Sequence, residues 1–156
     1  MTLLRCPARL VEQTLESLRA AGQRGTEGVV LWLAKRPLVD GAVIVETFIP
    51  EYTARADVFR IPPSAMTALM AHLRNQKLAL AAQVHSHPEL AFHSQADDAW
   101  AIVRHEGALS IVVPHFAQGV TADNFLAKTA TFRLSAEDRW LPVSPDDLPR
   151  HVELLL

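Results

Sequence analysis

A seven-residue apolar run, Gly28–Ala34 (GVVLWLA), constrains the fold more than any other segment of this 156-residue chain. The run is short for a helix and rich in β-branched and aromatic residues, so it predicts a buried strand. A second strand is predicted at Ala42–Ile49, after a turn at Pro37–Gly41. The short connection between the two strands favours a hairpin.

Helices and strands alternate along the rest of the chain. Apolar residues at helical spacing, followed by a glycine that typically ends a helix, predict the first helix. The tail, which carries Pro142, Pro145 and Pro149, predicts turns and irregular packing. The alternation indicates a mixed α/β protein with one domain over residues 1–156. The predicted helices are Pro7–Ala21, Ser64–Gln76 and Asp97–Glu106, and the further strands are Leu78–His85, Leu109–Val113 and Thr129–Leu134.

Composition excludes several classes of protein. The formal net charge is −2, so there is no basic footprint for nucleic acid. No apolar run is long enough to span a membrane, and the first residues lack a secretory signal pattern, so a cytoplasmic location is expected. Cys6 is the only cysteine, which rules out an internal disulfide and a zinc site built from thiolates.

A dense group of metal-binding residue types follows the strand predicted at Leu78–His85. His85 and His87 are two residues apart, so on an extended segment both imidazoles point to the same side. Pro88 turns the chain away, and Asp97 lies in the first turn of the next predicted helix. Two nitrogens and one carboxylate oxygen suit Zn²⁺ and leave a fourth position for water, as in a catalytic site.

Ser94 and Asp97 have a second interpretation that is compatible with metal binding. The spacing Ser94-x-x-Asp97 is typical of a helix N-terminus, where the serine hydroxyl caps the backbone and an acid follows three residues later. The other histidines of the chain have no partner at metal-binding spacing.

A zinc hydrolase also needs a general base, which is usually a carboxylate. Glu27 lies at the start of the first strand, next to Gly25 and Gly28, in a position expected to be exposed. Glu46 lies inside the second strand, where an outward-facing polar residue is a sufficient explanation. Spacing alone leaves the choice of Glu27 open.

Taken together, these residues resemble the JAMM (JAB1/MPN+/Mov34) metalloprotease family. The family pattern is a glutamate at a strand start, then His-x-His-Pro, then Ser-x-x-Asp. It is matched here by Glu27, His85-Ser86-His87-Pro88 and Ser94-Gln95-Ala96-Asp97, and the resemblance covers roughly residues 5–135. One departure is the loop between His87 and Ser94, which has six residues where the family usually has seven. The resemblance selects Glu27 over Glu46. It also implies an MPN/JAB-like domain of the α+β type, with a central mixed sheet flanked by helices.

The resemblance implies a role for each residue. His85, His87 and Asp97 would bind one zinc ion, Glu27 would be the general base, and Ser94 would help stabilise the oxyanion. The implied reaction is cleavage of a peptide or isopeptide bond after the C-terminal tail of a ubiquitin-like protein. A compact chain resembles the prokaryotic branch, whose members are often encoded beside E1-like and E2-like enzymes, including in anti-phage defence. Phe92 and His93 are candidates for the rim of the cleft.

Three alternatives remain open or are disfavoured. A peptidase that processes a sulfur-carrier protein would use the same metal chemistry on a similar tail, so the sequence does not separate it from a deconjugating enzyme. A metal-free scaffold of the MPN type would usually lack part of the ligand set, which this chain retains. A zinc nucleoside deaminase would need a Pro-Cys-x-x-Cys pair, and this chain has only Cys6.

Overall fold

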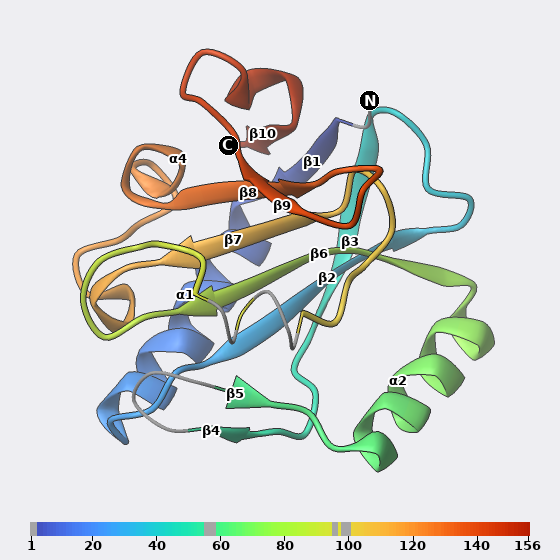
Figure 1. Ribbon diagram of the computed structural model, residues 1–156, viewed down its shortest axis with the longest axis horizontal. Helices are drawn as coiled ribbons and strands as arrows, with labels where there is room; N and C mark the ends of the chain where they lie inside the picture. The colour runs from blue at the N-terminus through green and yellow to red at the C-terminus, as the bar shows by residue number, and fades with distance from the viewer. Residues whose placement is uncertain (1–2, 55–58, 95–96, 98–100) are drawn as a thin grey trace.

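The computed structural model describes residues 3–54, 59–94, 97 and 101–156. Their strands form one curled, mixed eight-stranded sheet in the order β10-β1-β3-β2-β6-β7-β8-β9, with a separate pair β4-β5 (Figure 1). The α/β class predicted from the sequence is therefore confirmed. The strands are β1 (Leu4–Pro7), β2 (Val29–Lys35), β3 (Ala42–Phe48), β4 (Thr53–Ala54), β5 (Phe59–Arg60), β6 (Leu78–Ser86), β7 (Leu109–Val113), β8 (Ala130–Leu134), β9 (Trp140–Pro142) and β10 (Val152–Leu155). The helices are α1 (Ala8–Gln23), α2 (Pro63–Gln76), α4 (Phe125–Lys128) and the 3₁₀ turns η1 (His115–Ala117) and η2 (Leu148–Arg150).

Strand β2 is buried on both faces, which explains its uninterrupted apolar sequence. Val30 and Trp32 belong to the core cluster that includes the apolar stripe of α1. Leu31 and Leu33 belong to the cluster on the other face, against α2. The two helices thus cover opposite faces of the central strands, as Figure 1 shows.

The pairing of β2 determines where the ends of the strands lie. β2 forms the predicted antiparallel hairpin with β3 and is also antiparallel to β6, with Val29 opposite His85. The start of β2 therefore lies beside the end of β6. β7 runs parallel to β6, so its end, near Val113, lies at the same edge of the sheet.

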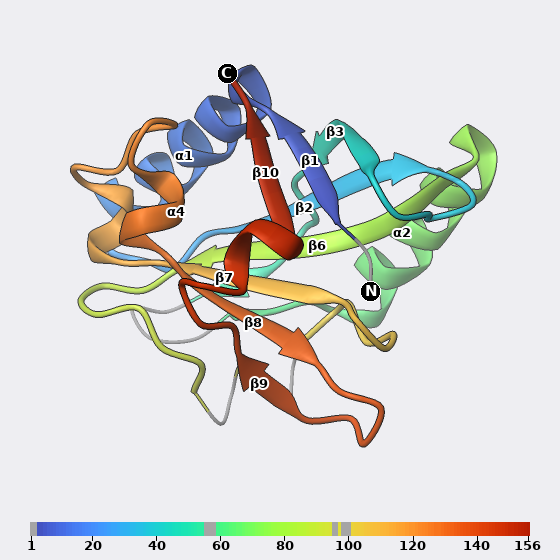
Figure 2. The ribbon, with the colours of Figure 1, turned by 90° about the horizontal axis from the view of Figure 1, so that it is seen from above.

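The two ends of the chain meet in the sheet, which the sequence did not predict. β1 and β10 pair in parallel, with Leu4 opposite Val152, and the two strands lie side by side in Figure 2. The tail expected to be irregular in fact contains the last residue of β9 and the whole of β10. Both strands are short, and β10 is held by a partner almost the whole chain away, so no local pattern marks it. In the described part of the chain, no helix is long and apolar enough to cross a membrane.

The helix predicted at Asp97–Glu106 is only partly borne out. Asp97 is helical and residues 98–100 lie outside the described residues, but residues 101–106 are not helical. The backbone N–H of Ile102 donates to Oε1 of the Gln83 side chain at 2.8 Å, instead of to a carbonyl one turn earlier. The apolar spacing that suggests a helix here instead places Val103 in a small cluster with Leu134.

Candidate metal centre

The end of β6 directs two histidines into one buried site. His85 is the penultimate residue of β6, and His87 follows the strand directly. Their ring centroids are 5.2 Å apart, and the two residues are 0% and 3% exposed. The backbone of His87 is held on both sides, because its N–H donates to the carbonyl of Val113 and its carbonyl accepts from Phe116. The two imidazoles therefore converge as their spacing predicted.

Glu27 reaches the same site from the start of β2. Its Oε1 atom lies 3.4 Å from Nε2 of His87. The antiparallel register, which pairs Val29 with His85, places Glu27 opposite His87 when it is extended by two residues. The next residue, Gly28, donates its N–H to the buried hydroxyl of Ser86 at 2.8 Å. The expectation that Glu27 would be exposed is wrong, since it is 0% exposed. The start of β2 packs against α1 and is not open to solvent.

Gly28 is what lets α1 cover Glu27's strand so closely. A Cβ atom at this position would lie 2.9 Å from Cδ2 of Leu18 and 3.1 Å from Cβ of Ala21. Both contacts are shorter than ordinary van der Waals separations, so a side chain would displace the helix or the strand. The glycine beside Glu27 therefore serves close packing.

Asp97 completes the cluster from the long connection between β6 and β7. Its Oδ2 atom lies 3.1 Å from Nε2 of His87 and 3.2 Å from Nε2 of His85. Ser94 and Asp97 exchange hydrogen bonds: the Ser94 N–H donates to Oδ2 at 2.8 Å, and the Asp97 N–H donates to the Ser94 hydroxyl at 3.0 Å. This is the reciprocal capping arrangement expected from the Ser-x-x-Asp spacing.

The carboxyl group of Asp97 stays ionised in this setting. Burial acts to raise its pKa, but hydrogen bonds from His85 and His87 and from the Ser94 N–H outweigh burial and hold the pKa well below its usual range. A carboxylate that is buried, charged and aimed at two imidazoles is in the form that a metal ion requires.

The donor atoms fit a zinc ion. One donor atom each from Glu27, His85, His87 and Asp97 lies within 4.8 Å of the other three. A tetrahedral ion with bonds of about 2.0–2.1 Å would hold neighbouring ligand atoms roughly 3.3 Å apart. The contacts of Asp97 Oδ2 with the two histidines, 3.1 and 3.2 Å, are close to this value. The cluster therefore supplies nitrogen and oxygen donors at a separation suited to zinc.

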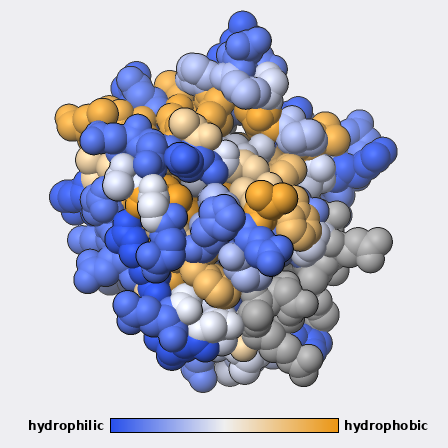
Figure 3. All heavy atoms as spheres, turned by 90° about the vertical axis from the view of Figure 1, so that its left-hand side faces the viewer, coloured by the Kyte–Doolittle hydropathy of each residue, from blue (hydrophilic) through white to orange (hydrophobic). Residues whose placement is uncertain are grey.

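The loop before Ser94 covers part of this cluster. The ring of Phe92 packs edge-on against His87, with centroids 4.6 Å apart, and 54% of Phe92 is exposed. His93 lies beneath the loop instead, where its ring is 5.0 Å from Phe132 and 5.1 Å from Trp140. The loop extends to the left in Figure 1, and Figure 3 views that side, where apolar patches lie among polar side chains. Of the two rim candidates, Phe92 is the one on the outer surface.

The competing carboxylate has a different partner. Glu46 does not belong to the cluster of four, and its Oε2 atom lies 2.5 Å from Nε2 of His72 on α2. The spacing of the sequence gave His72 no partner, because the two residues are brought together only when α2 packs on the sheet. The structure thus separates the two glutamates that sequence spacing left open.

Three residues that support the site carried a weak signal in the sequence. Ser86, Gln83 and Ser110 are all 0% exposed and interrupt strands that are otherwise apolar. A polar residue inside a buried strand requires a hydrogen-bond partner, and that requirement could have marked these positions.

The fold and the buried cluster define a class: α/β proteins in which two histidines and two carboxylates can hold a metal ion at the end of the sheet. The sequence matches the family described as prokaryotic homologs of the JAB domain over residues 7–128, and the chain belongs to this family. It is 35% identical over 153 residues to a Sinorhizobium fredii (strain NBRC 101917 / NGR234) protein described as "Probable metalloprotease y4jG", covering 95% of this chain and 91% of that protein. The solution structure of protein DSY2949 from Desulfitobacterium hafniense has the same fold, with a TM-score of 0.67, 15% identity, and coverage of 98% and 93% of the two chains.

Proposed function

We propose that this protein is a zinc-dependent peptidase or isopeptidase that cleaves after the C-terminal tail of a ubiquitin-like protein. The observation that carries the proposal is the fully buried cluster of four, in which one donor atom each from Glu27, His85, His87 and Asp97 lies within 4.8 Å of the others. Family resemblance then assigns His85, His87 and Asp97 as ligands and leaves Glu27 as the adjacent carboxylate. Three protein ligands with an adjacent carboxylate are what a catalytic zinc site needs, because one position stays open.

In this proposal His85, His87 and Asp97 hold the zinc ion. When bound, zinc supplies a Lewis acid that makes water acidic enough to ionise near neutral pH. The carboxylate of Glu27 takes a proton from the attacking water while the oxygen of that water bonds to the carbonyl carbon of the substrate. Glu27 then delivers this proton to the leaving nitrogen as the carbon–nitrogen bond breaks, so the products are a carboxylic acid and an amine.

Ser94 is suited to stabilise the negative charge that develops on the carbonyl oxygen. Its hydroxyl oxygen already accepts the N–H of Asp97, which fixes the position of the group. Within the described ranges no acceptor for the hydroxyl proton is found, so this proton is available to an oxyanion.

The substrate class rests on family resemblance and on the relative described as a metalloprotease. Tails of ubiquitin-like proteins are extended and end in small residues, which suits a narrow cleft. E1-like and E2-like proteins encoded nearby would then be partners, and a cytoplasmic role in anti-phage defence would be one setting. Processing of a sulfur-carrier protein remains the second candidate, because the same buried cluster would serve it.

The first experiment is elemental analysis of the purified protein beside His87→Ala and Asp97→Ala. About one zinc per wild-type chain, sharply reduced in both variants, supports the site. His72→Ala is the matched control, because it removes a histidine that contacts Glu46 and should leave zinc content unchanged. Little metal in the wild type after zinc is supplied would overturn the hydrolase proposal and favour a binding module.

Cleavage assays then separate the roles of the two glutamates. With fusions that place a reporter after the tails of several ubiquitin-like and sulfur-carrier proteins, Glu27→Gln should retain zinc but lose about 10²–10⁴-fold in rate. Glu46→Gln changes the same chemical group on the neighbouring strand and should retain most of the activity. Equal loss in the two variants would remove Glu27 from the proposed role.

A further inference from the structure

Two buried polar side chains form a bridge between neighbouring strands directly below the metal cluster. Gln83 on β6 and Ser110 on β7 are register partners, and both are 0% exposed. The Gln83 Nε2 group donates to the Ser110 hydroxyl oxygen at 3.1 Å. Gln83 lies two residues before His85, so its side chain leaves the sheet on the same face as that ligand.

Each member of this bridge also holds one end of the segment that carries Ser94 and Asp97. At the first end, the Ser110 hydroxyl lies 3.1 Å from Nε2 of His93. At the second end, Oε1 of Gln83 accepts the backbone N–H of Ile102 at 2.8 Å. The bridge therefore joins positions 93 and 102, which enclose both functional residues.

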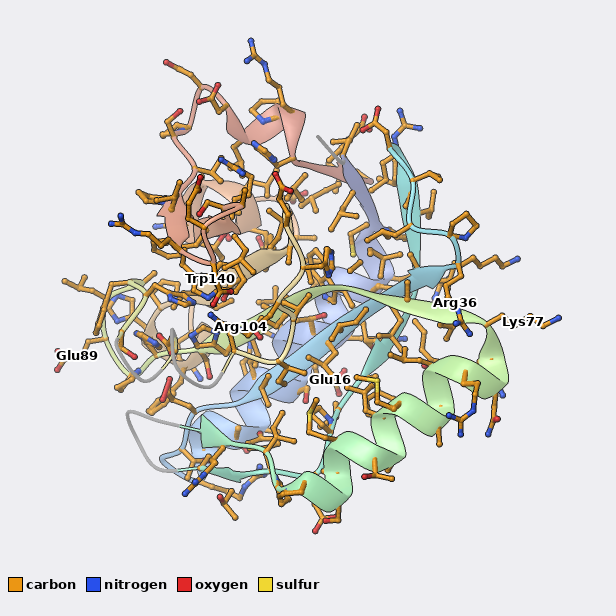
Figure 4. All side chains as sticks on the ribbon, turned by 45° about the vertical axis from the view of Figure 1, so that its right-hand side comes forward. Glu16, Arg36, Lys77, Glu89, Arg104 and Trp140 are labelled. Atoms are coloured by element: carbon orange, nitrogen blue, oxygen red, sulfur yellow. The ribbon has the colours of Figure 1, made fainter. Side chains whose placement is uncertain are left out.

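The ring of His93 reinforces the first end. It packs against Phe132 of β8 and Trp140 of β9, with centroids 5.0 and 5.1 Å away. Trp140 lies within the body of the molecule, whereas Glu89, in the preceding part of the loop, lies at its outer edge (Figure 4). One side of the loop is thus anchored in the sheet while the other side faces solvent.

We propose that Gln83 and Ser110 act as positioning residues that close the base of segment 93–102 and hold Asp97 in place before a metal ion arrives. The inference rests on the proposed function for its link to catalysis, but the anchoring itself does not depend on it. Because His93 and Ile102 are both anchored, Asp97 between them has less conformational freedom to lose when it engages the metal. If either anchor is lost, the metal itself must hold Asp97 in place, which lowers the apparent affinity.

The bridge also explains why two polar residues occupy fully buried positions in β6 and β7. Both polar atoms of the Gln83 amide have a partner, because Nε2 donates to Ser110 and Oε1 accepts from Ile102. Removing either side chain leaves buried polar groups of the other unsatisfied, which is more costly than the loss of one exposed hydrogen bond.

The test compares Gln83→Met, Ser110→Ala and the double variant. Zinc affinity, measured by competition with a chelating dye, should fall about tenfold in each single variant. The zinc affinity of the double variant should be only slightly lower than that of either single variant, because both changes break the same bridge. In the metal-free proteins, hydrogen exchange should accelerate in peptides covering residues 88–103 more than in β2 or β7.

Two controls separate anchoring from a general loss of stability. Ser135→Ala removes another buried serine hydroxyl, one that accepts the N–H of Arg139 in the turn before β9, and should leave zinc affinity unchanged. At the half-buried position of His93, His93→Gln can keep a hydrogen bond to Ser110, whereas His93→Phe keeps only the ring contacts. His93→Gln should therefore retain more zinc affinity than His93→Phe.

Two outcomes would overturn the inference. One is that Ser110→Ala has the same zinc affinity and the same local hydrogen exchange as Ser135→Ala. The other is that the losses of zinc affinity in the two single variants add fully in the double variant. A wild type that binds zinc but cleaves no fusion would count against the proposed function and not against the anchor, since exchange and metal affinity are measured without substrate. If Gln83→Met fails to fold, the two His93 variants test the anchoring instead. Equal zinc affinity in His93→Gln and His93→Phe would then overturn it.

Discussion

The candidate metal site, taken together with Ser94, consists of two halves that are held in place by different means. The strand half, Glu27, His85 and His87, comes from the ends of β2 and β6, whose antiparallel register brings these residues together. The loop half, Ser94 and Asp97, lies on a connection that crosses the sheet and is tied to it by side chains. In the strand half, position is a consequence of the core. In the loop half, it depends on a few hydrogen bonds.

This difference predicts how each half fails. Damage to the strand half should lower the free energy of unfolding of the whole protein, because the ligands share their strands with the main core. Damage to the loop half should leave the fold largely intact and change metal binding or activity. The variants below test that division, beginning with the largest effect on stability.

Gly28→Val should be the most destabilising change. The new side chain would begin 2.9 Å from Leu18 Cδ2 and 3.1 Å from Ala21 Cβ, so α1 and β2 could not keep their present separation. Overpacking of this kind typically lowers the free energy of unfolding by about 2 kcal/mol. Urea denaturation of the metal-free wild type and variant measures this change in the free energy of unfolding. Unchanged stability would show that the start of β2 is not part of the rigid core.

Ser86→Ala should have the next largest effect. The hydroxyl accepts the N–H of Gly28 in a fully buried position, and its loss leaves that N–H without this partner beside Glu27. We expect the free energy of unfolding to fall by about 1–2 kcal/mol. Ser135→Ala, where the hydroxyl accepts a longer 3.2 Å hydrogen bond in a turn, is the matched comparison and should fall less. The reverse order would contradict a site built on strand register.

Phe92→Ala tests the loop half. The ring touches His87 but is 54% exposed, so the free energy of unfolding should change by no more than about 0.5 kcal/mol. Zinc should stay bound while the cleavage rate falls, because the ring forms part of the approach to the cluster. Leu90→Ala, at a position that is 70% exposed on the same loop, is the control. If Phe92→Ala lowers the free energy of unfolding as much as Ser86→Ala does, the loop half is as closely coupled to the core as the strand half.

The same division explains what the sequence could predict. The strand half was predictable, because His-x-His at the end of an apolar strand dictates that both rings share a side, and the apolar runs marked β2 and β6. Resemblance supplied Glu27, whose position opposite His87 follows only from the strand register. The neighbouring glycines predict an exposed Glu27, but Gly28 instead allows close contact with α1, which buries this end of the strand.

The loop half was predictable only in part. Ser94 and Asp97 were identified because their reciprocal hydrogen bonds are local in sequence. The helix expected to follow was wrong over residues 101–106, since Ile102 donates to a side chain on a distant strand. β10 was missed for the same reason, as its partner β1 lies at the other end of the chain. Local patterns carry no information about partners that only the folded chain brings together.

Cys6 offers the finest test of the comparison, because it reports on the sheet and not on the loop. The thiol lies in β1, is 0% exposed, and burial raises its pKa to about 12, although Arg9 opposes this. At pH 8 the native thiol therefore stays protonated and buried, and iodoacetamide should react only when the sheet opens and the thiol regains an ordinary pKa of about 8.5. The rate of labelling of metal-free Phe92→Ala should differ from that of the wild type by no more than about twofold. Gly28→Val should be labelled roughly thirtyfold faster, which corresponds to a fall of about 2 kcal/mol in the free energy of unfolding. Mass spectrometry of timed samples gives both rates, and comparable acceleration in the two variants would mean that loop and sheet open as one unit.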